Sequence, residues 1–428
     1  MAADAASKPA LLRSLRPRSA LAGFIAMRAA DELAAQMLNV GIGWYVYAAT
    51  HDPMSLAFVG LAQFLPNIGL VLIAGHVPDR FDRRTVVALS LSAQMLLIAG
   101  FAAFTAVATP AAAPVYVLLL AIGSARAFAS PAMAALLPRL MSAAEFPRAV
   151  AAASSIFQLC SIAGPAAGGL VYAVIGPGMF AVVALCYLVA TIVMRSLASA
   201  GAAGAVDAAG DGAPDVAADS QILGGIRYIW SNRLLLGLMS LDLFAVLLGG
   251  VTALLPIYAK DILAVGPFGL GCLRCAPGVG AALIGVVLAR RAIDRGAGKR
   301  MLLCVAGFGA SIVVFALSKN AWLSLVALAA AGGFDMVSMV VRQTLVQLST
   351  PDAMRGRVSA VHFAFVGASS ELGEFESGVA AALFGTVPAA LLGGLGTLGV
   401  VALWSRLFPE LRQADRSAPA PIAPGSVR

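Results

Sequence analysis

Long apolar runs recur along most of this 428-residue chain, and they constrain its fold more than any other feature. A helix needs about 20 predominantly apolar residues to cross a bilayer, and runs of that kind recur between residues 20 and 408. Hydrophobic residues make up 60% of the chain and charged residues only 12%, whereas a soluble domain carries about 25% charged residues. The sequence therefore predicts an all-α integral membrane protein.

Turn signals divide the apolar runs into twelve predicted membrane spans, grouped as two halves of six helices. Two of these signals are His51-Asp52-Pro53 and Gly176-Pro177-Gly178. The predicted spans cover residues 20–49, 54–77, 85–108, 114–138, 149–172, 178–198, 234–258, 267–289, 301–318, 321–347, 358–384 and 387–408. The predicted domains are an N-terminal segment at 1–19, a first half at 20–198, a linker at 199–233, a second half at 234–408 and a tail at 409–428.

Basic residues are distributed as expected for a membrane protein with both termini in the cytoplasm. With that orientation, 23 of the 29 Lys and Arg lie in cytoplasmic segments or, as Arg195 and Arg406 do, at the cytoplasmic ends of spans, and two, Lys260 and Lys319, lie on the opposite side. The remaining four lie inside predicted spans: Arg28, Arg126, Arg274 and Arg342. Because Lys and Arg concentrate in cytoplasmic loops, this bias supports the predicted topology. It also explains the net charge of +8 without a nucleic-acid partner.

Signatures of soluble enzymes are absent from the sequence. No G-x-x-x-x-G-K-[ST] segment is present for nucleotide binding. No H-E-x-x-H motif or metal-spaced Cys/His cluster is present, and the five Cys fall in apolar runs, which argues against a disulfide framework. We therefore predict a protein that is not an enzyme, binds no metal or cofactor, and draws its energy from an ion gradient.

Ionisable residues inside the predicted spans are candidate functional residues, because charges are costly in a bilayer. In the first span, Arg28, Glu32 and Gln36 recur at steps of four and form a polar stripe, with Asp31 beside it. Asp31 and Glu32 lie about 17 Å deep by helical rise, near the bilayer centre, and Arg126 in the fourth span is expected at a similar depth.

Further candidates lie in the second half. The predicted proton-coupling acids are Asp31, Glu32, Glu371 and Glu374. The predicted substrate contacts or charge partners are Arg28, Arg126, Asp335 and Arg342. A buried structural ion pair is the alternative for each, in particular for Arg28 with Glu32 and for Asp335 with Arg342. We expect structural roles for Asp242, Arg274 and Glu376, and assign no role to His76 or His362.

Two motifs carry a resemblance to a known family. The segment after the second span contains Gly75, Asp79, Arg80, Arg83 and Arg84, which resembles the cytoplasmic loop signature of the major facilitator superfamily, with Asp82 at the position of the usual second glycine. In that family the loop latches the two halves together during the transport cycle. The resemblance covers roughly residues 20–408.

The fifth span contains Gly164-Pro165-Ala166-Ala167-Gly168-Gly169, which resembles the GPxxGG motif of the superfamily's proton-coupled exporters. Arg126 resembles the buried arginine of the family's fourth-helix motif. The segments Trp44–Tyr47, Gln63–Pro66, Leu254–Ala259 and Glu371–Gly378 are similar to the enterobactin-exporter and macrolide-efflux branch. In the fifth span we expect Gly164, Pro165, Gly168 and Gly169 to bend the helix or to permit a tight helix crossing.

The resemblance implies a multi-pass transporter of the bacterial inner membrane. It would export amphipathic small molecules, siderophores or drugs, by proton antiport and alternating access. The expected partners are a small-molecule substrate and the lipid bilayer, and we expect a monomer. Two alternatives remain open from the sequence: an importer or facilitator of a small solute on the same scaffold, and a lipid-handling or signalling membrane protein.

Overall fold

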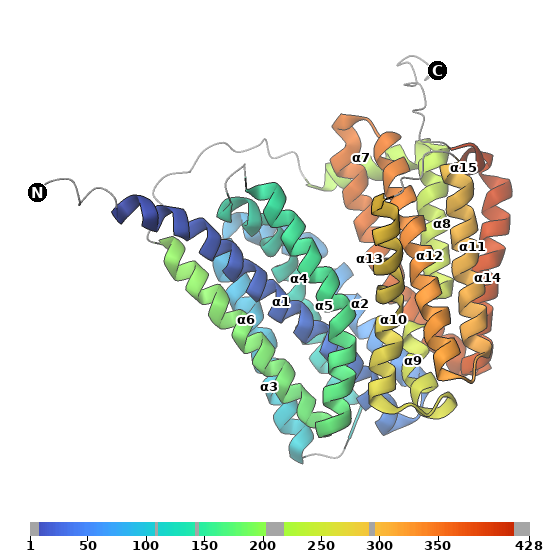
Figure 1. Cartoon of the computed structure of the whole chain (residues 1–428), viewed down its shortest axis with the longest axis horizontal. Helices are drawn as coiled ribbons and strands as arrows, with labels where there is room; N and C mark the ends of the chain where they lie inside the picture. Colours follow the sequence, from blue (N-terminus) through green and yellow to red (C-terminus); the bar gives the residue numbers. More distant parts are fainter. Residues whose placement is uncertain (1–7, 108–109, 142–144, 203–217, 291–295, 415–428) are drawn as a thin grey trace, which may run out of the picture. The chain divides into compact units, whose positions relative to one another are not determined.

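The computed structural model of the chain describes residues 8–107, 110–141, 145–202, 218–290 and 296–414. Every regular element in these ranges is a helix (Figure 1), which confirms the all-α prediction. In the first part of the chain the elements are α1 Lys8–Thr50, α2 Pro53–Arg80, α3 Arg83–Val107, α4 Ala113–Leu140, α5 Phe146–Ile175, η1 Gly176–Gly178 and α6 Met179–Ala202. The later elements are α7 Ala218–Ser231, α8 Arg233–Gly249, η2 Val251–Leu254, α9 Leu255–Ile257, η3 Tyr258–Ile262, α10 Gly266–Arg290, α11 Ala297–Leu317, α12 Ala321–Leu348, α13 Asp352–Phe384, α14 Thr386–Leu407 and α15 Pro409–Gln413.

Eight helical stretches among the described residues are long and apolar enough to cross a membrane. One of them, Phe146–Leu197, combines α5 and α6 across the short η1 turn. Helix α1 is not among the eight, and Arg28, Asp31 and Glu32 lie within it. The chain is thus a multi-pass membrane protein, and the count of twelve spans stays a prediction.

The predicted seventh span, 234–258, is not one continuous helix. Helix α8 ends at Gly249, and Gly250 separates it from the 3-10 turn η2. The short α9 follows, with Pro256 inside it, and then the π-helical turn η3. Gly249 and Gly250 are adjacent, and Pro256 follows seven residues after Gly249. These residues account for the break, because glycine weakens a helix interior and proline removes a backbone donor.

The described helices belong to two compact units. The first comprises residues 1–210 together with 253–275, so that α9, η3 and the beginning of α10 pack with the N-terminal helices. Within it, α1 packs along α5 and α6, α3 packs against α4 and α6, and α2 packs against α4. An aromatic cluster fills part of the interior, where the rings of Tyr45, Phe101 and Phe180 meet edge to face with centroids 4.9–5.9 Å apart.

The second unit comprises residues 211–252 and 276–428. Helix α8 packs against α13 and α14, and α11 packs against α12 and α14. Apolar side chains of these helices form a buried core that includes Leu235, Leu238 and Met301. One polar contact ties α14 to α8 within it, because Trp404 Nε1 donates to Ser240 Oγ at 2.8 Å. The two units are therefore each a helical bundle with its own apolar core.

Candidate functional site

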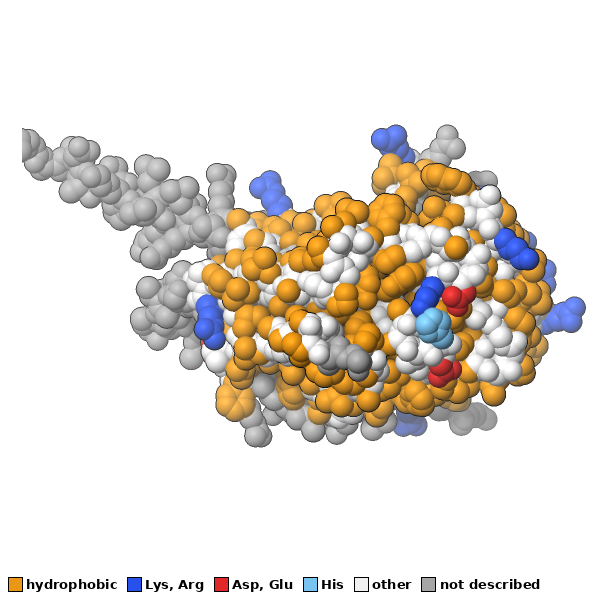
Figure 2. Space-filling model, turned by 90° about the horizontal axis from the view of Figure 1, so that it is seen from below, with side chains coloured by type: hydrophobic (Ala, Val, Ile, Leu, Met, Phe, Trp, Pro, Cys, Tyr) orange, Lys and Arg blue, Asp and Glu red, His pale blue; other side chains and the backbone are white. Residues whose placement is uncertain are grey.

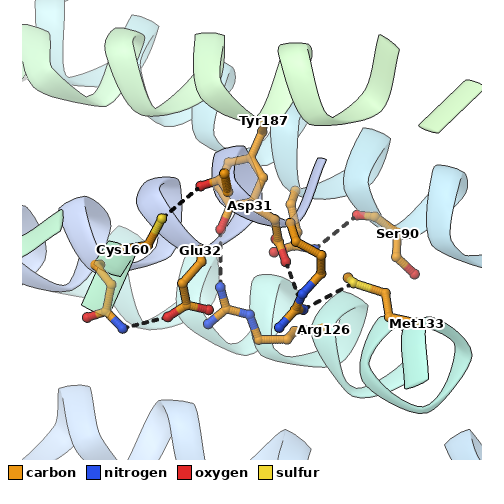
Figure 3. A network of polar contacts seen from close by, with 11 residues as sticks. Asp31, Glu32, Ser90, Arg126, Met133, Cys160 and Tyr187 are labelled. Atoms are coloured by element: carbon orange, nitrogen blue, oxygen red, sulfur yellow. Dashed lines mark hydrogen bonds and ion pairs between the residues drawn. The ribbon is translucent and has the colours of Figure 1, made fainter. Parts of the chain in front are cut away.

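Asp31 lies at the centre of a charged cluster in the first unit. It is buried on α1, with 6% of its surface exposed, and Arg28 Nη1 lies 3.7 Å from its Oδ2 (Figure 3). Its other oxygen, Oδ1, is buried without a hydrogen-bond partner among the described residues. Arg28 also donates to Met133 Sδ on α4 at 3.4 Å. A buried carboxylate held by one long ion pair is a costly arrangement, which is typical of functional sites.

Glu32 has a different partner from the one that helical spacing suggested. The sequence pattern offered Arg28 as its i,i+4 partner, but the structure pairs Arg28 with Asp31 at i,i+3. Gln36 Nε2 instead donates to Glu32 Oε1 at 2.7 Å. Glu32 is half-buried. The stripe on α1 therefore holds an ion pair and an adjacent amide–carboxylate pair one turn apart.

Arg126 reaches this cluster from α4. Its Nη2 donates to the hydroxyl of Tyr187 at 3.3 Å, and Tyr187 is fully buried on α6. Arg126 also interacts electrostatically with Asp31 and Glu32. Figure 3 shows Arg126, Asp31, Glu32 and Tyr187 in the same small region. Three helices, α1, α4 and α6, thus bring two carboxylates, two guanidinium groups and a phenol together in a bundle interior.

The segment Gly164–Gly169 in α5, called the helix-five motif below, forms a close contact between α5 and α1. A Cβ added to Gly164 would lie 2.5 Å from Gln36 Cβ, and one added to Gly168 would lie 2.8 Å from Met37 Cα. Both distances are shorter than packed atoms tolerate, so only glycine fits here. Gln36 is also the side chain that binds Glu32. The motif therefore presses α5 against the same stripe that carries the charged cluster.

Gly169 and Pro165 continue this contact towards α10. A Cβ on Gly169 would lie 2.6 Å from the carbonyl oxygen of Pro267, and one on Gly271 would lie 2.5 Å from that of Pro165. Gly169 and Pro165 are both buried. The helices thus meet backbone to backbone at glycines from each side, so the first unit has a tight crossing at this motif.

A second charged cluster lies in the second unit. Arg342 Nη1 on α12 lies 2.6 Å from Asp242 Oδ1 on α8, and both side chains are 6% exposed. Asp335 has an exposed side chain on α12, and no described basic side chain lies within 4.0 Å of its carboxylate. Glu371 and Glu374 are half-buried on α13. The structure therefore pairs Arg342 with Asp242, for which the sequence suggested only a structural role.

The charged loop motif falls partly in helix. Helix α2 continues through Gly75 to Arg80, and the side chains of Asp79 and Arg80 lie outside the described residues. Arg83 Nη1 donates to the carbonyl oxygen of Ala135 on α4 at 3.5 Å, and Arg84 is half-exposed.

Asp82, which stands where the superfamily signature has glycine, has a local role of its own. Its Oδ2 accepts from Thr85 N at 3.3 Å and from Thr85 Oγ1 at 3.1 Å. These bonds satisfy a backbone donor in the first turn of α3, which is the role of an N-cap residue. The departure from the motif therefore has a helix-capping explanation.

A third cluster was not found by sequence reasoning. Tyr47 on α1 donates to Asp261 on η3, and Lys260 Nζ lies 2.8 Å from His51 Nε2. Figure 2 shows acidic, basic and histidine side chains gathered on a largely apolar face. These four residues, Tyr47, His51, Lys260 and Asp261, are called the α1–η3 cluster below. More than 200 residues separate its two halves, so no local pattern could predict it.

Comparison with known proteins gives the class and then the family. A mutant of the nucleoside transporter NupG has a TM-score of 0.73 and 11% identity, over 91% of this chain and 100% of that chain. A POT peptide transporter mutant has a TM-score of 0.70 and 11% identity, over 92% and 95%. These likenesses show that the chain has the fold of these solved transporters. The chain belongs to the family of transmembrane secretion effectors, whose model matches residues 23–425.

Two curated relatives are siderophore transporters. The enterobactin exporter EntS of Escherichia coli O6:K15:H31 is 25% identical over 395 residues, which are 91% of this chain and 92% of that protein. The staphyloferrin A transporter of Staphylococcus aureus is 28% identical over 163 residues, or 37% and 41% of the two chains. These matches confirm the predicted superfamily and branch, and they confirm that the chain is a transporter and not an enzyme.

Proposed function

We propose that this protein exports an amphipathic small molecule, of the siderophore or hydrophobic-drug class, across the bacterial inner membrane in exchange for protons. The buried cluster of Asp31 with Arg28 and Arg126 is the observation that carries the proposal. The similarity to the enterobactin exporter over 91% of the chain supports the substrate class and the direction. We further propose twelve spans, cytoplasmic termini and a monomeric transporter.

Asp31 is the proposed proton carrier, with Glu32 as the second acid. Burial disfavours the charged carboxylate, whereas the two guanidinium groups favour it. A proton on Asp31 would remove most of its attraction for Arg28 and Arg126. The freed guanidinium groups could then bind an anionic or hydroxyl group of the substrate, because arginine matches planar oxygen ligands well. Proton and substrate would therefore compete for the same arginines, which is the requirement for exchange.

Glu371 and Glu374 are the reserve candidates for proton coupling, since both are half-buried on α13 in the second unit. The helix-five motif is proposed to close the path on one side, because its glycines already allow α5 and α1 to touch.

Asp79 is proposed to latch the cytoplasmic side in one state of the cycle. We expect Asp79→Asn to reduce transport while expression and substrate binding remain intact.

Transport in proteoliposomes tests the proposal. The purified protein would be assayed with a catecholate siderophore and with a hydrophobic cationic dye, with and without an imposed pH gradient. Accumulation of either probe that requires the gradient supports proton exchange. Asp31→Asn should abolish gradient-driven accumulation but preserve exchange of labelled for unlabelled probe without a gradient, and Arg126→Ala should reduce both.

Asp352→Asn serves as the matched control, because Asp352 is an exposed acid with a surface partner, Arg355, at 2.8 Å. It should transport at the wild-type rate. If Asp31→Asn and Glu32→Gln, alone and together, still accumulate probe against a gradient, the coupling acid is elsewhere. Accumulation in the direction of import, or driven by sodium instead of protons, would contradict the proposal itself.

A further inference from the structure

The two charged clusters differ in their charge balance. In the first unit, Arg28 and Arg126 face the two carboxylates of Asp31 and Glu32, so the cluster is balanced without a bound proton. In the second unit, Arg342 pairs with Asp242 and interacts electrostatically with a second carboxylate, Asp335. One negative charge in the second unit therefore lacks a matching cation among these three side chains.

Asp242 and Arg342 form the tight part of the second cluster. Their ion pair is 2.6 Å long, and each side chain is 6% exposed. The same Nη1 lies 3.5 Å from Ser338 Oγ. Arg342 Nε, in contrast, is buried and has no hydrogen-bond partner among the described residues. A buried guanidinium with an unused donor has the capacity to hold a second acceptor.

Asp335 is placed to be that acceptor. It precedes Ser338 by three residues and Arg342 by seven, so all three lie on one face of α12. Its carboxylate interacts electrostatically with both Arg342 and Asp242. Helix α12 is one of the stretches apolar enough to cross the membrane, where an unpaired carboxylate is costly. A proton would remove that cost.

Three ionisable groups on α13 belong to the same unit. His362 is buried and interacts electrostatically with Arg342, and Glu371 and Glu374 are half-buried acids.

We propose that Asp242, Asp335 and Arg342 form a second proton-binding site, in which one proton serves two carboxylates that share a single arginine. When Asp335 carries the proton, the Asp242–Arg342 pair is neutral and complete. When the proton leaves, Arg342 is drawn between both carboxylates through its unused Nε. This inference rests on the proposed proton exchange, and it adds a proton-binding step in the second half of the chain.

Infrared spectroscopy of the purified full-length protein in liposomes tests the site without any substrate. A change of pH should produce a difference band from the C=O stretch of protonated carboxyl groups. The part of this band that belongs to the second site should be lost in Asp335→Asn and kept in Asp31→Asn and in the surface control Asp352→Asn. An unchanged band in Asp335→Asn overturns the proposal.

Folding yield tests the sharing of Arg342. Asp242→Asn should still fold, because Asp335 can then balance Arg342, whereas Asp242→Asn with Asp335→Asn should lose most folded protein by leaving a buried guanidinium uncompensated. If the double variant folds as well as Asp242→Asn alone, the carboxylates do not share Arg342. A rise in thermal stability with sodium instead of potassium, abolished by Asp335→Asn, would identify a metal-cation site and overturn the assignment to a proton.

The transport and infrared results together distinguish a failure of this second site from a failure of the proposed function. If Asp31→Asn transports normally while Asp335→Asn loses its carboxyl band, the coupling role of Asp31 is wrong and the second site stands. If the band persists in Asp335→Asn while Asp31→Asn abolishes gradient-driven transport, the first site stands alone.

Discussion

The Tyr47 hydroxyl on α1 donates a hydrogen bond to the carboxylate of Asp261 on η3, although 214 residues separate them. Lys260 reinforces this contact, since its Nζ lies 5.6 Å from the centroid of the Tyr47 ring and 2.8 Å from His51 Nε2. The end of α1 is thus fastened to η3 by a hydrogen bond, a cation–π contact and a lysine–imidazole contact.

Tyr47→Phe should lower the stability of the protein by about 1 kcal/mol, because it removes the hydroxyl that binds Asp261 while keeping the ring. Thermal unfolding of the purified protein in detergent measures the change. Tyr116→Phe is the matched control, since Tyr116 donates to a neutral acceptor, the carbonyl oxygen of Ser55, at 3.1 Å. If Tyr116→Phe lowers the stability as much as Tyr47→Phe does, the bond to Asp261 contributes no more than the bond to a neutral acceptor.

Gly168→Ala should destabilise the protein by about 1–3 kcal/mol and abolish export, because the new Cβ would lie 2.8 Å from Met37 Cα, a backbone atom that cannot move aside. Gly100→Ala is the control. Gly100 lies inside α3 with no atom within 4 Å of an added Cβ, so this change should leave stability equal or raise it by about 0.5–1 kcal/mol. Unfolding curves and transport of both variants would be compared, and equal effects would show that close packing at Gly168 is unimportant.

Reporter fusions test the proposed topology. Fusions after residue 220 and at the C-terminus should both report the cytoplasm, since 23 of the 29 basic residues lie in segments assigned to that side. A control fusion after Lys319 should report the opposite side. A fusion on the wrong side of the membrane at any of the three positions would require a different number of spans.

The helices were predictable wherever a long apolar run had clear ends. The span predicted at 321–347 corresponds to α12, Ala321–Leu348, because Asn320 caps its start through bonds to Trp322 N and Leu323 N. The break after Gly249 was missed, because the apolar run continues through Val251–Leu255 and hydropathy does not register backbone conformation. The structured end of the predicted linker, α7, was also missed.

The candidate site was predictable in its members but not in its pairs. Helical spacing placed Arg28, Asp31 and Glu32 on neighbouring positions, but side-chain direction decided that Arg28 binds Asp31. Asp242 was expected to be structural because nothing in α8 shows that Arg342, 100 residues later, reaches it. Partners that come from distant helices depend on how the bundle packs, and a single sequence contains no direct record of that.

Residues 253–275 pack with the first unit, which has a consequence for a chain that is cleaved between its two halves. A cut in the segment 199–226 would leave those residues on the C-terminal fragment, although their packing partners α1 and α5 lie on the N-terminal one. Neither fragment would then possess a complete core, because the glycine contact between α5 and α10 and the Tyr47–Asp261 bond would each be divided. The pair would have to be synthesised together and assemble by complementation, as a donated segment does in a swapped dimer.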